Sequence, residues 1–273
     1  MNRHQLLLTK NNCYKNYQKH TVRGILVHST GANNPYLKRY IGPDDGLLGK
    51  NPNGNHWNQP KPDGISKCVH AFIGKLNDGT IATYQTLPWG IKGWHSGSGR
   101  LGSSKNANNN GYIGFEICED DLKDSKYFNA VYKEAVELCA HLCTYYNIKP
   151  VSPYLICHSE GSKLGIASNH GDVMHWFPKH GKSMDTFRAD VAALMSKGTT
   201  PQTESKEVVA TPKEYKVKVT ADSLNIRSGP GTSYKIVGAI KDRGVYTIIE
   251  ERNGWGKLKS KVGWIRLSYT KKI

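Results

Sequence analysis

Short apolar runs alternate with turn-rich stretches over the first 197 residues of the chain. Residues 125–146 carry apolar side chains at helical spacing, and the pattern ends before Pro150, as expected for a helix ahead of a proline. A second helix is expected at residues 186–195, with Ser183 or Asp185 as its N-cap. The other runs predict strands at residues 22–29, 69–76 and 80–87 (joined by the hairpin turn signal Asn-Asp-Gly at 77–79), 112–118 and 151–158. This order predicts an α/β domain in which helices flank a mixed central β-sheet.

A break in composition at residues 198–214 divides the chain. This segment is rich in Thr, Pro, Glu and Lys and has neither an aromatic residue nor an apolar period, which is typical of an extended linker. We therefore expect one domain at residues 1–197 and a second at residues 215–273. The second has β-branched runs separated by Gly, Pro, Asn and Asp without a helical period, which predicts a small all-β barrel.

Composition and charge exclude several classes of protein. The chain is 37% hydrophobic with a mean hydropathy of −0.58, which is too apolar for a disordered protein. It has no apolar run of about 18 residues, so no membrane insertion is expected. Three leucines at 6–8 are too few for the apolar stretch of roughly 7–15 residues in a secretory signal, so no signal peptide is expected. The six cysteines form no C-x-x-C pair and are predicted to be reduced, buried thiols.

The net charge points to an anionic partner. The chain has 38 Lys and Arg against 22 Asp and Glu, a formal charge of +16. Nucleic acid, anionic lipid and an acidic bacterial wall would all suit this charge. The basic residues are not gathered in one arm and carry no nucleic-acid-binding signature, so we expect no nucleic-acid partner.

Two histidines and one glutamate stand where a sheet could bring them together. His28 and His158 each end a predicted strand, and histidines at the carboxyl ends of strands can face one crevice as metal ligands. The alternative for each is a hydrogen-bonded core histidine. Glu116 lies inside a predicted strand, where a buried carboxylate is costly unless a cation or a proton-transfer role keeps it there. Near a catalytic zinc it would be the general base, and the alternative is an outward-facing glutamate on an edge strand.

The third metal ligand is less well defined by the sequence. A catalytic zinc usually takes three protein ligands and keeps a fourth position for water, so one more ligand should follow His158. Asp185 precedes the last helix and has Lys182 nearby, whose ammonium could stabilise an oxyanion. Asp185 could equally be only a helix N-cap, and His175 and Asp172 are rivals as ligands.

Five segments, in order, resemble the zinc-dependent N-acetylmuramoyl-L-alanine amidases of the type-2 family. They are Val-His-Ser-Thr at 27–30, the segment around His70, Trp-His-Ser-Gly at 94–97, Ile-Gly-Phe-Glu at 113–116 and Cys-His-Ser-Glu at 157–160. The resemblance covers about residues 15–197. It implies a mixed sheet with a cleft that holds one Zn²⁺, and hydrolysis of the amide between N-acetylmuramic acid and L-alanine in peptidoglycan.

The resemblance also implies roles for single residues. His28 and His158 would be zinc ligands and Glu116 the base, and the substrate would be contacted by His70, Trp94 and His95. The family's third ligand is a Cys or Asp, usually about ten residues after the second histidine and two after a lysine. Lys182 and Asp185 are similar but stand farther along the chain, with one more residue between them. Residues 169–178 would then be an insertion over the cleft.

The tail resembles a bacterial SH3-like domain. The resemblance rests on Leu-Asn-Ile-Arg-Ser-Gly-Pro-Gly at 224–231, Gly-Trp-Gly-Lys-Leu at 254–258 and Gly-Trp-Ile at 263–265. It implies binding to the cell wall, with Trp255 and Trp264 as wall-binding residues; the alternative is that both only fill the barrel core. Residues 215–273 hold 13 Lys and Arg and four Asp and Glu, which suits an acidic wall.

An amidase joined to a wall-binding module, without a signal peptide, resembles a phage endolysin. This implies synthesis in the cytoplasm of the host bacterium, release with the help of a phage holin, and action on the cell wall. The alternatives are a bacterial autolysin of the same chemistry and a peptidoglycan-binding protein without catalysis. A glycosidase would need two opposed carboxylates rather than a pair of histidines.

Overall fold

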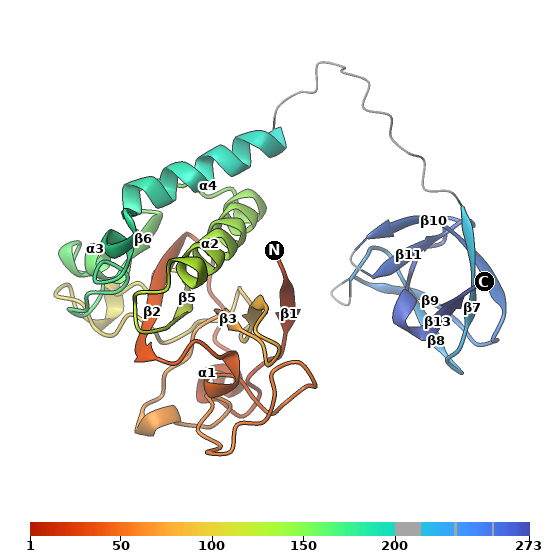
Figure 1. Ribbon diagram of the computed structural model, residues 1–273, viewed down its shortest axis with the longest axis horizontal. Coiled ribbons are helices and arrows are strands. Elements are labelled where there is room, and N and C mark those ends of the chain that lie inside the picture. Colours follow the sequence, from red (N-terminus) through yellow and green to blue (C-terminus); the bar gives the residue numbers. More distant parts are fainter. Residues whose placement is uncertain (200–213, 232–233, 253) are drawn as a thin grey trace. The chain divides into compact units, whose positions relative to one another are not determined.

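The computed structural model describes residues 1–199, 214–231, 234–252 and 254–273 (Figure 1). The chain divides into two compact units, Met1–Thr200 and Pro201–Ile273, which are described separately below. Residues 200–213 of the predicted linker lie outside the described residues. Among the helices in the described parts of the chain, none is both long and apolar enough to cross a bilayer.

The first unit is built on a six-stranded sheet with the strand order β1-β4-β3-β5-β2-β6. The strands are β1 Arg3–Gln5, β2 Gly24–Asn33, β3 Ala71–Lys75, β4 Ile81–Gln85, β5 Tyr112–Glu119 and β6 Leu155–Cys157. The pair β3 and β4 forms the predicted antiparallel hairpin, and every other neighbouring pair is parallel. The sheet is therefore mixed, as predicted, although the short parallel strand β1 had no signal in the sequence.

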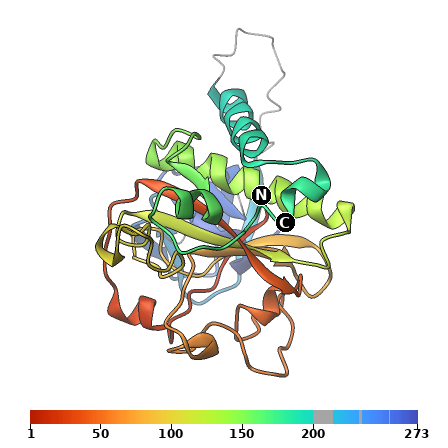
Figure 2. The same ribbon diagram turned by 90° about the vertical axis from the view of Figure 1, so that its left-hand side faces the viewer.

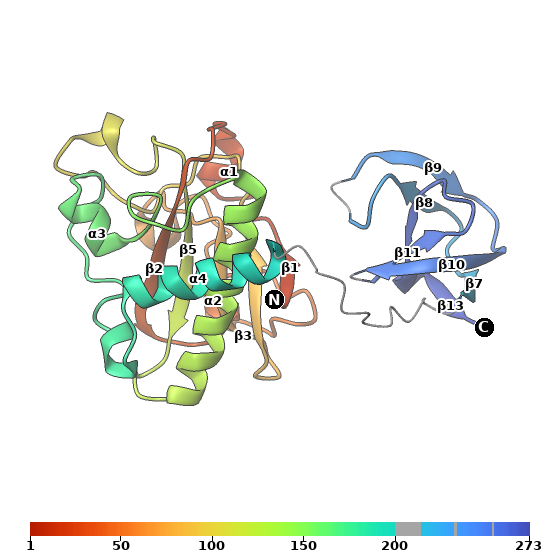
Figure 3. The same cartoon turned by 90° about the horizontal axis from the view of Figure 1, so that it is seen from above.

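Two long helices, α2 (Ser125–Tyr146) and α4 (Met184–Thr199), cover one face of this sheet (Figures 2 and 3). Shorter helical segments lie in the connections: α1 Asn12–Asn16, η1 Leu37–Arg39, η2 Pro62–Gly64, η3 Ser103–Lys105, α3 His158–Lys163 and η4 Phe177–His180. Both long helices were predicted. The N-cap of α4 is supplied by Ser183, whose Oγ accepts a hydrogen bond from the backbone N–H of Thr186 at 3.2 Å.

Alternation along the strands sends side chains to opposite faces of the sheet. In β2 and β5 the residues Ile25, Val27 and Phe115 pack in the core beneath α2. Their neighbours His28 and Glu116 therefore point to the other face. Loops with short helical segments, rather than long helices, cover that face, with a second apolar cluster that includes Leu37, Tyr40, Ile41, Leu48, Trp57, Phe72 and Tyr84. A sheet face covered by loops leaves room for a cleft at its end.

A conservative substitution in the core beneath α2 provides a test of this packing. Ile117 is fully buried, and we expect Ile117→Val to destabilise the first unit by about 0.5–1.5 kcal/mol because it removes one methylene from a packed core. Chemical denaturation of the full chain would measure this. Ile65→Val is the matched control, since Ile65 is 58% exposed and should change stability much less. Equal effects at the two positions would contradict the packing described here.

The second unit is an all-antiparallel sheet with the strand order β13-β7-β10-β11-β12-β8-β9. Its elements are β7 Tyr215–Val219, β8 Leu224–Arg227, β9 Ile236–Ile240, β10 Val245–Arg252, β11 Trp255–Leu258, β12 Trp264–Arg266, η5 Leu267–Tyr269 and β13 Thr270–Lys272. Its core is small and apolar: Val217, Val219, Leu224, Ile240, Ile248, Leu258 and Ile265. The prediction of a small all-β unit is confirmed.

Candidate metal centre

The sheet brings His28, Glu116 and His158 to one end. His28 lies directly opposite Glu116 in the parallel pair of β2 and β5. On the other side of β2, Val27 lies opposite Cys157, the last residue of β6. The residues that follow, His28 in β2 and His158 at the start of α3, therefore lie at the same level of the sheet. The strand predicted at residues 151–158 is shorter than expected, because residues 151–154 form a turn before Leu155 and His158 already begins α3. The side chain of Glu160 caps that helix by accepting the Cys157 N–H at 3.2 Å.

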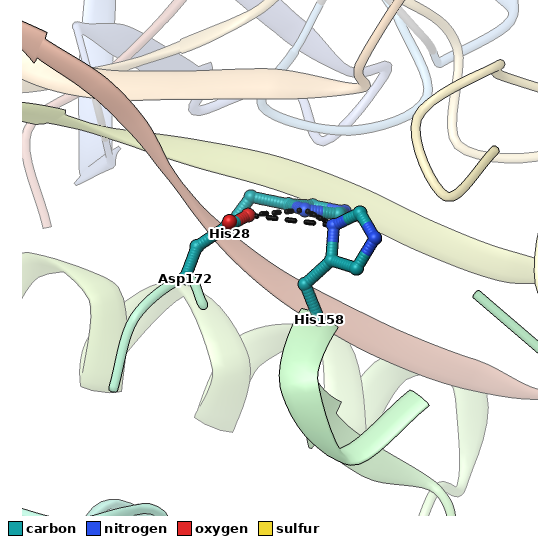
Figure 4. A group of neighbouring side chains, drawn as sticks. All are labelled: His28, His158 and Asp172. Atoms are coloured by element: carbon teal, nitrogen blue, oxygen red, sulfur yellow. Dashed lines mark hydrogen bonds and ion pairs between the residues drawn. The ribbon is translucent and has the colours of Figure 1, made fainter. Parts of the chain in front are cut away.

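Asp172 completes a compact group with the two histidines (Figure 4). The His28 Nδ1 lies 3.1 Å from Asp172 Oδ2 and 3.0 Å from His158 Nδ1. The third distance, from His158 Nδ1 to Asp172 Oδ2, is 3.4 Å. Two imidazole nitrogens and a carboxylate oxygen thus converge on one point.

The protonation states of His28 and Asp172 favour binding of a cation. Burial lowers the pKa of His28 in spite of its contact with Asp172, so the neutral imidazole is favoured. Burial would raise the pKa of Asp172, but its contacts with the imidazoles of His158 and His28 hold it far below the usual range. Neutral imidazole and ionised carboxylate are the forms that coordinate metals.

Glu116 lies beside this group without belonging to it. Its Oε2 is buried and has no hydrogen-bond partner among the described residues. Burial raises the pKa of Glu116 well above its ordinary value, and the nearby charge of Asp172 adds to the effect. A buried carboxyl group with a raised pKa and an unpaired oxygen can take up and release a proton.

A cleft of about 490 Å³ opens over these residues. It is lined by His28, Glu116, His158 and Asp172. Further around the cleft lie Arg39, Tyr40, Trp57, Lys67, Trp94, His95, Ser168 and His170. The cluster therefore lies on the wall of a cleft large enough to admit water.

The structure places the other candidates for the third ligand elsewhere. The Asp185 side chain is 91% exposed and pairs with Arg188 at 2.6 Å. Lys182 binds Asp190 at 3.1 Å and does not line the cleft. The Nε2 of His175 donates to the Oε1 of the buried Glu119 at 2.9 Å. Of the residues weighed for this role in the sequence, only Asp172 lies with His28 and His158.

The three residues expected to contact substrate have different surroundings. His70 is fully buried, with its Nε2 bonded to the Ile91 carbonyl at 2.8 Å and its Nδ1 accepting the Gly114 N–H at 3.1 Å. Burial lowers the pKa of His70 to about 3. Both of its ring nitrogens are thus used within the protein. Trp94 and His95 do line the cleft.

In the second unit, the two tryptophans proposed to bind the wall are largely buried. Trp255 is 5% exposed and Trp264 is 7% exposed. Arg266 lies over the Trp255 ring and Lys257 over the Trp264 ring. Neither indole belongs to the apolar core of this unit; each packs against a basic side chain on the neighbouring strand.

Ser168 and His170 extend the site beyond the residues that sequence reasoning assigned. The His158 Nε2 lies 3.2 Å from Ser168 Oγ, which in turn lies 3.0 Å from His170 Nδ1. His170 belongs to residues 169–178, expected from the sequence to be an insertion over the cleft, but nothing there singled it out. Ser168 had no sequence signal, because its position depends on how a loop folds back onto α3.

Fold and cleft together define a mixed α/β domain with a His-His-Asp group at one end of its sheet, followed by a small β unit. Residues 18–173 match the family described as N-acetylmuramoyl-L-alanine amidase. This is more than half of the chain, and the chain therefore belongs to that family. Residues 222–271 match the bacterial SH3 domain.

Several solved structures are similar in fold to the first unit. The PlyG catalytic domain is 16% identical, with 74% of this chain and 99% of that chain covered and a TM-score of 0.49. The Staphylococcus aureus hydrolase AmiA, in complex with its ligand, is 18% identical, with 73% and 86% covered and a TM-score of 0.48. A mutant endolysin from Bacillus subtilis is 22% identical, with 70% and 99% covered and a TM-score of 0.46. No curated protein matches the chain.

Proposed function

We propose that this chain is a zinc-dependent amidase that hydrolyses the bond between N-acetylmuramic acid and L-alanine in bacterial peptidoglycan. The observation that carries the proposal is the convergence of His28, His158 and Asp172 beside Glu116, within the segment that matches the amidase family. Residues 1–197 would be the catalytic domain and residues 215–273 the wall-binding domain, with residues 198–214 as the linker.

The donor set fits zinc. Catalytic zinc is commonly bound by imidazole nitrogens and a carboxylate, three protein ligands in all, and the three ligand atoms here lie within 4.8 Å of one another. We assign Asp172 rather than Asp185 as the third ligand. The family match ends at residue 173, so it includes Asp172 and stops short of Lys182 and Asp185. A bound zinc ion would lower the pKa of a water molecule and polarise the scissile carbonyl.

The protein's own groups would move the proton. Glu116 would take a proton from the attacking water as its oxygen adds to the lactyl carbonyl. It would then deliver that proton to the nitrogen of L-alanine as the C–N bond breaks, leaving a carboxylate on the lactyl group and a free amine on the peptide. His170 stands two residues before Asp172, the place that a lysine occupies in the family, and it lines the cleft. We therefore assign His170, rather than Lys182, to stabilise the oxyanion.

The C-terminal unit would keep the enzyme on its polymeric substrate. Binding of the SH3-like unit to the wall makes each further encounter with a scissile bond intramolecular, which raises the effective substrate concentration. As a phage endolysin, the protein would be made in the host cytoplasm and released with a holin. A bacterial autolysin would use the same site.

Digestion of purified peptidoglycan by the full chain tests the proposal. We expect mass spectrometry to find stem peptides with a free N-terminal L-alanine and no new reducing ends on the glycan. Removal of metal with a chelator should abolish the digestion, and added Zn²⁺ should restore it, because the proposed mechanism needs the metal to activate the attacking water. New reducing ends would indicate a glycosidase, and zinc binding without cleavage would indicate a peptidoglycan receptor. Full activity of metal-free protein would refute the zinc mechanism.

A further inference from the structure

The imidazole of His95 lies in a chain of hydrogen bonds that runs from the Tyr112 carbonyl through His95 to His28 of the proposed metal centre. Its Nε2 lies 3.2 Å from the carbonyl oxygen of Tyr112. A carbonyl can only accept, so this nitrogen carries the ring proton and donates it. In the neutral ring the other nitrogen, Nδ1, must then be an acceptor.

That acceptor fixes the orientation of His28. The His28 Nε2 lies 3.0 Å from His95 Nδ1, and it must donate because His95 Nδ1 carries no proton. The lone pair of neutral His28 is therefore on Nδ1, the atom that faces Asp172 and His158. We propose that His95 is a positioning residue for the zinc centre: it holds His28 in the tautomer and orientation that present Nδ1 to the metal. This inference rests on the proposed function and replaces a substrate-binding role for His95.

The surrounding residues fit the His95 ring closely and hold its backbone. A β-carbon on Gly114 would lie 2.4 Å from His95 Nδ1, so the ring occupies space that only glycine leaves free at that position of β5. The backbone N–H of His95 donates to the Oδ1 of the fully buried Asn108 at 2.8 Å. The ring and its backbone are thus held on both sides, and the acceptor cannot turn away from His28 without breaking these contacts.

His158 has a corresponding partner in Ser168. Its Nε2 lies 3.2 Å from Ser168 Oγ. The Ser168 hydroxyl can donate its own hydrogen bond to the Ser96 carbonyl at 3.3 Å or to His170 Nδ1. His158 can therefore donate through Nε2 and keep the lone pair of Nδ1 for the metal. Both imidazoles are oriented by groups of the 95–96 and 168–170 segments.

The test measures zinc affinity, not turnover. In the full chain, His95→Leu removes the acceptor while keeping a bulky side chain at this position, and we expect zinc binding to weaken about 10–100-fold in competition with a chromogenic chelator. His95→Asn places an amide oxygen close to the position of Nδ1 and should recover most of the affinity. His141→Leu, on the exposed side of α2, is the matched control and should bind zinc like the wild type.

The outcomes separate this inference from the proposed function. His95→Leu with wild-type zinc affinity, or His95→Asn as weak as His95→Leu, would overturn the positioning role while leaving the amidase proposal intact. A wild-type chain that binds no zinc would overturn the proposed function itself and the inference with it.

A second measurement reads the tautomer of His28 in the wild type and does not depend on the His95 variants. Long-range ¹H–¹⁵N correlation of the zinc-loaded wild type should show His28 protonated at Nε2, with its signals identified by their absence in His28→Ala. Protonation at Nδ1 would overturn the assignment.

Discussion

Replacing Glu116 by Gln should lower amidase turnover by about 10²–10⁴-fold while zinc content stays at the wild-type level. The substitution keeps the shape of the side chain but removes its ability to accept and return a proton. Glu116 is not part of the His-His-Asp group, so the proposed metal ligands should remain in place. Release of stem peptides from purified walls would measure turnover, and elemental analysis would measure zinc.

The matched control is Glu137→Gln on the surface of α2, where the carboxylate pairs with the N-terminal amine. It changes the same functional group far from the cleft and should leave turnover close to that of the wild type. If Glu116→Gln lysed walls at the wild-type rate, Glu116 would have no part in proton transfer. If it lost zinc as well as activity, its role would lie in holding the metal site.

The parts of the site that could be predicted from the sequence lie on regular structure. His28 and Glu116 sit on strands with strong apolar patterns, and the parallel pairing of those strands places them opposite each other. Alternation along a strand then decides which face each side chain takes. For these residues, a local pattern and a simple rule of sheet geometry were sufficient.

The sequence offered Asp172, the proposed third ligand, only as a rival to Asp185, because a loop carries it. Asp172 is followed by Val173, Trp176 and Phe177, all fully buried in the core beneath α2. The burial of these apolar side chains holds Asp172 at the end of the sheet. They follow no helical or strand period, so the sequence did not reveal this placement. Asp185 was favoured there because it stands near Lys182, but the first turn of α4 presents its side chain to solvent.

His70 and His95 show a related limit. Both stand in segments that resemble the amidase family, and the sequence offered no way to separate a ligand-facing ring from a buried one. The difference arises from tertiary contacts: backbone groups satisfy both nitrogens of His70, whereas His95 turns its acceptor toward His28. Hydrogen-bond partners of this kind come from distant segments, so they are visible only in the folded chain.

Removing the Asp172 carboxylate should have the second large effect. Loss of a residue that only hydrogen-bonds to a metal ligand weakens metal binding by up to roughly 100-fold. We expect Asp172→Ala to weaken zinc binding by more than this, because it removes a proposed ligand itself. Amidase activity should fall with the zinc content. Two neutral imidazoles would remain, without the negative charge that balances the cation. Chelator competition and wall digestion on the full chain would measure both quantities.

Asp185→Ala is the matched control, because it removes the same carboxylate from the residue that the sequence alone favoured. Asp185 is exposed, and its partner Arg188 is also held by Glu160 at 2.9 Å, so the local structure keeps an anchor. Zinc affinity and turnover should therefore stay close to the wild type. The opposite pattern, with zinc lost in Asp185→Ala and kept in Asp172→Ala, would require α4 to approach the cleft in the active protein. Loss of zinc in both variants would mean that the two carboxylates act on one site, which this arrangement of side chains does not allow.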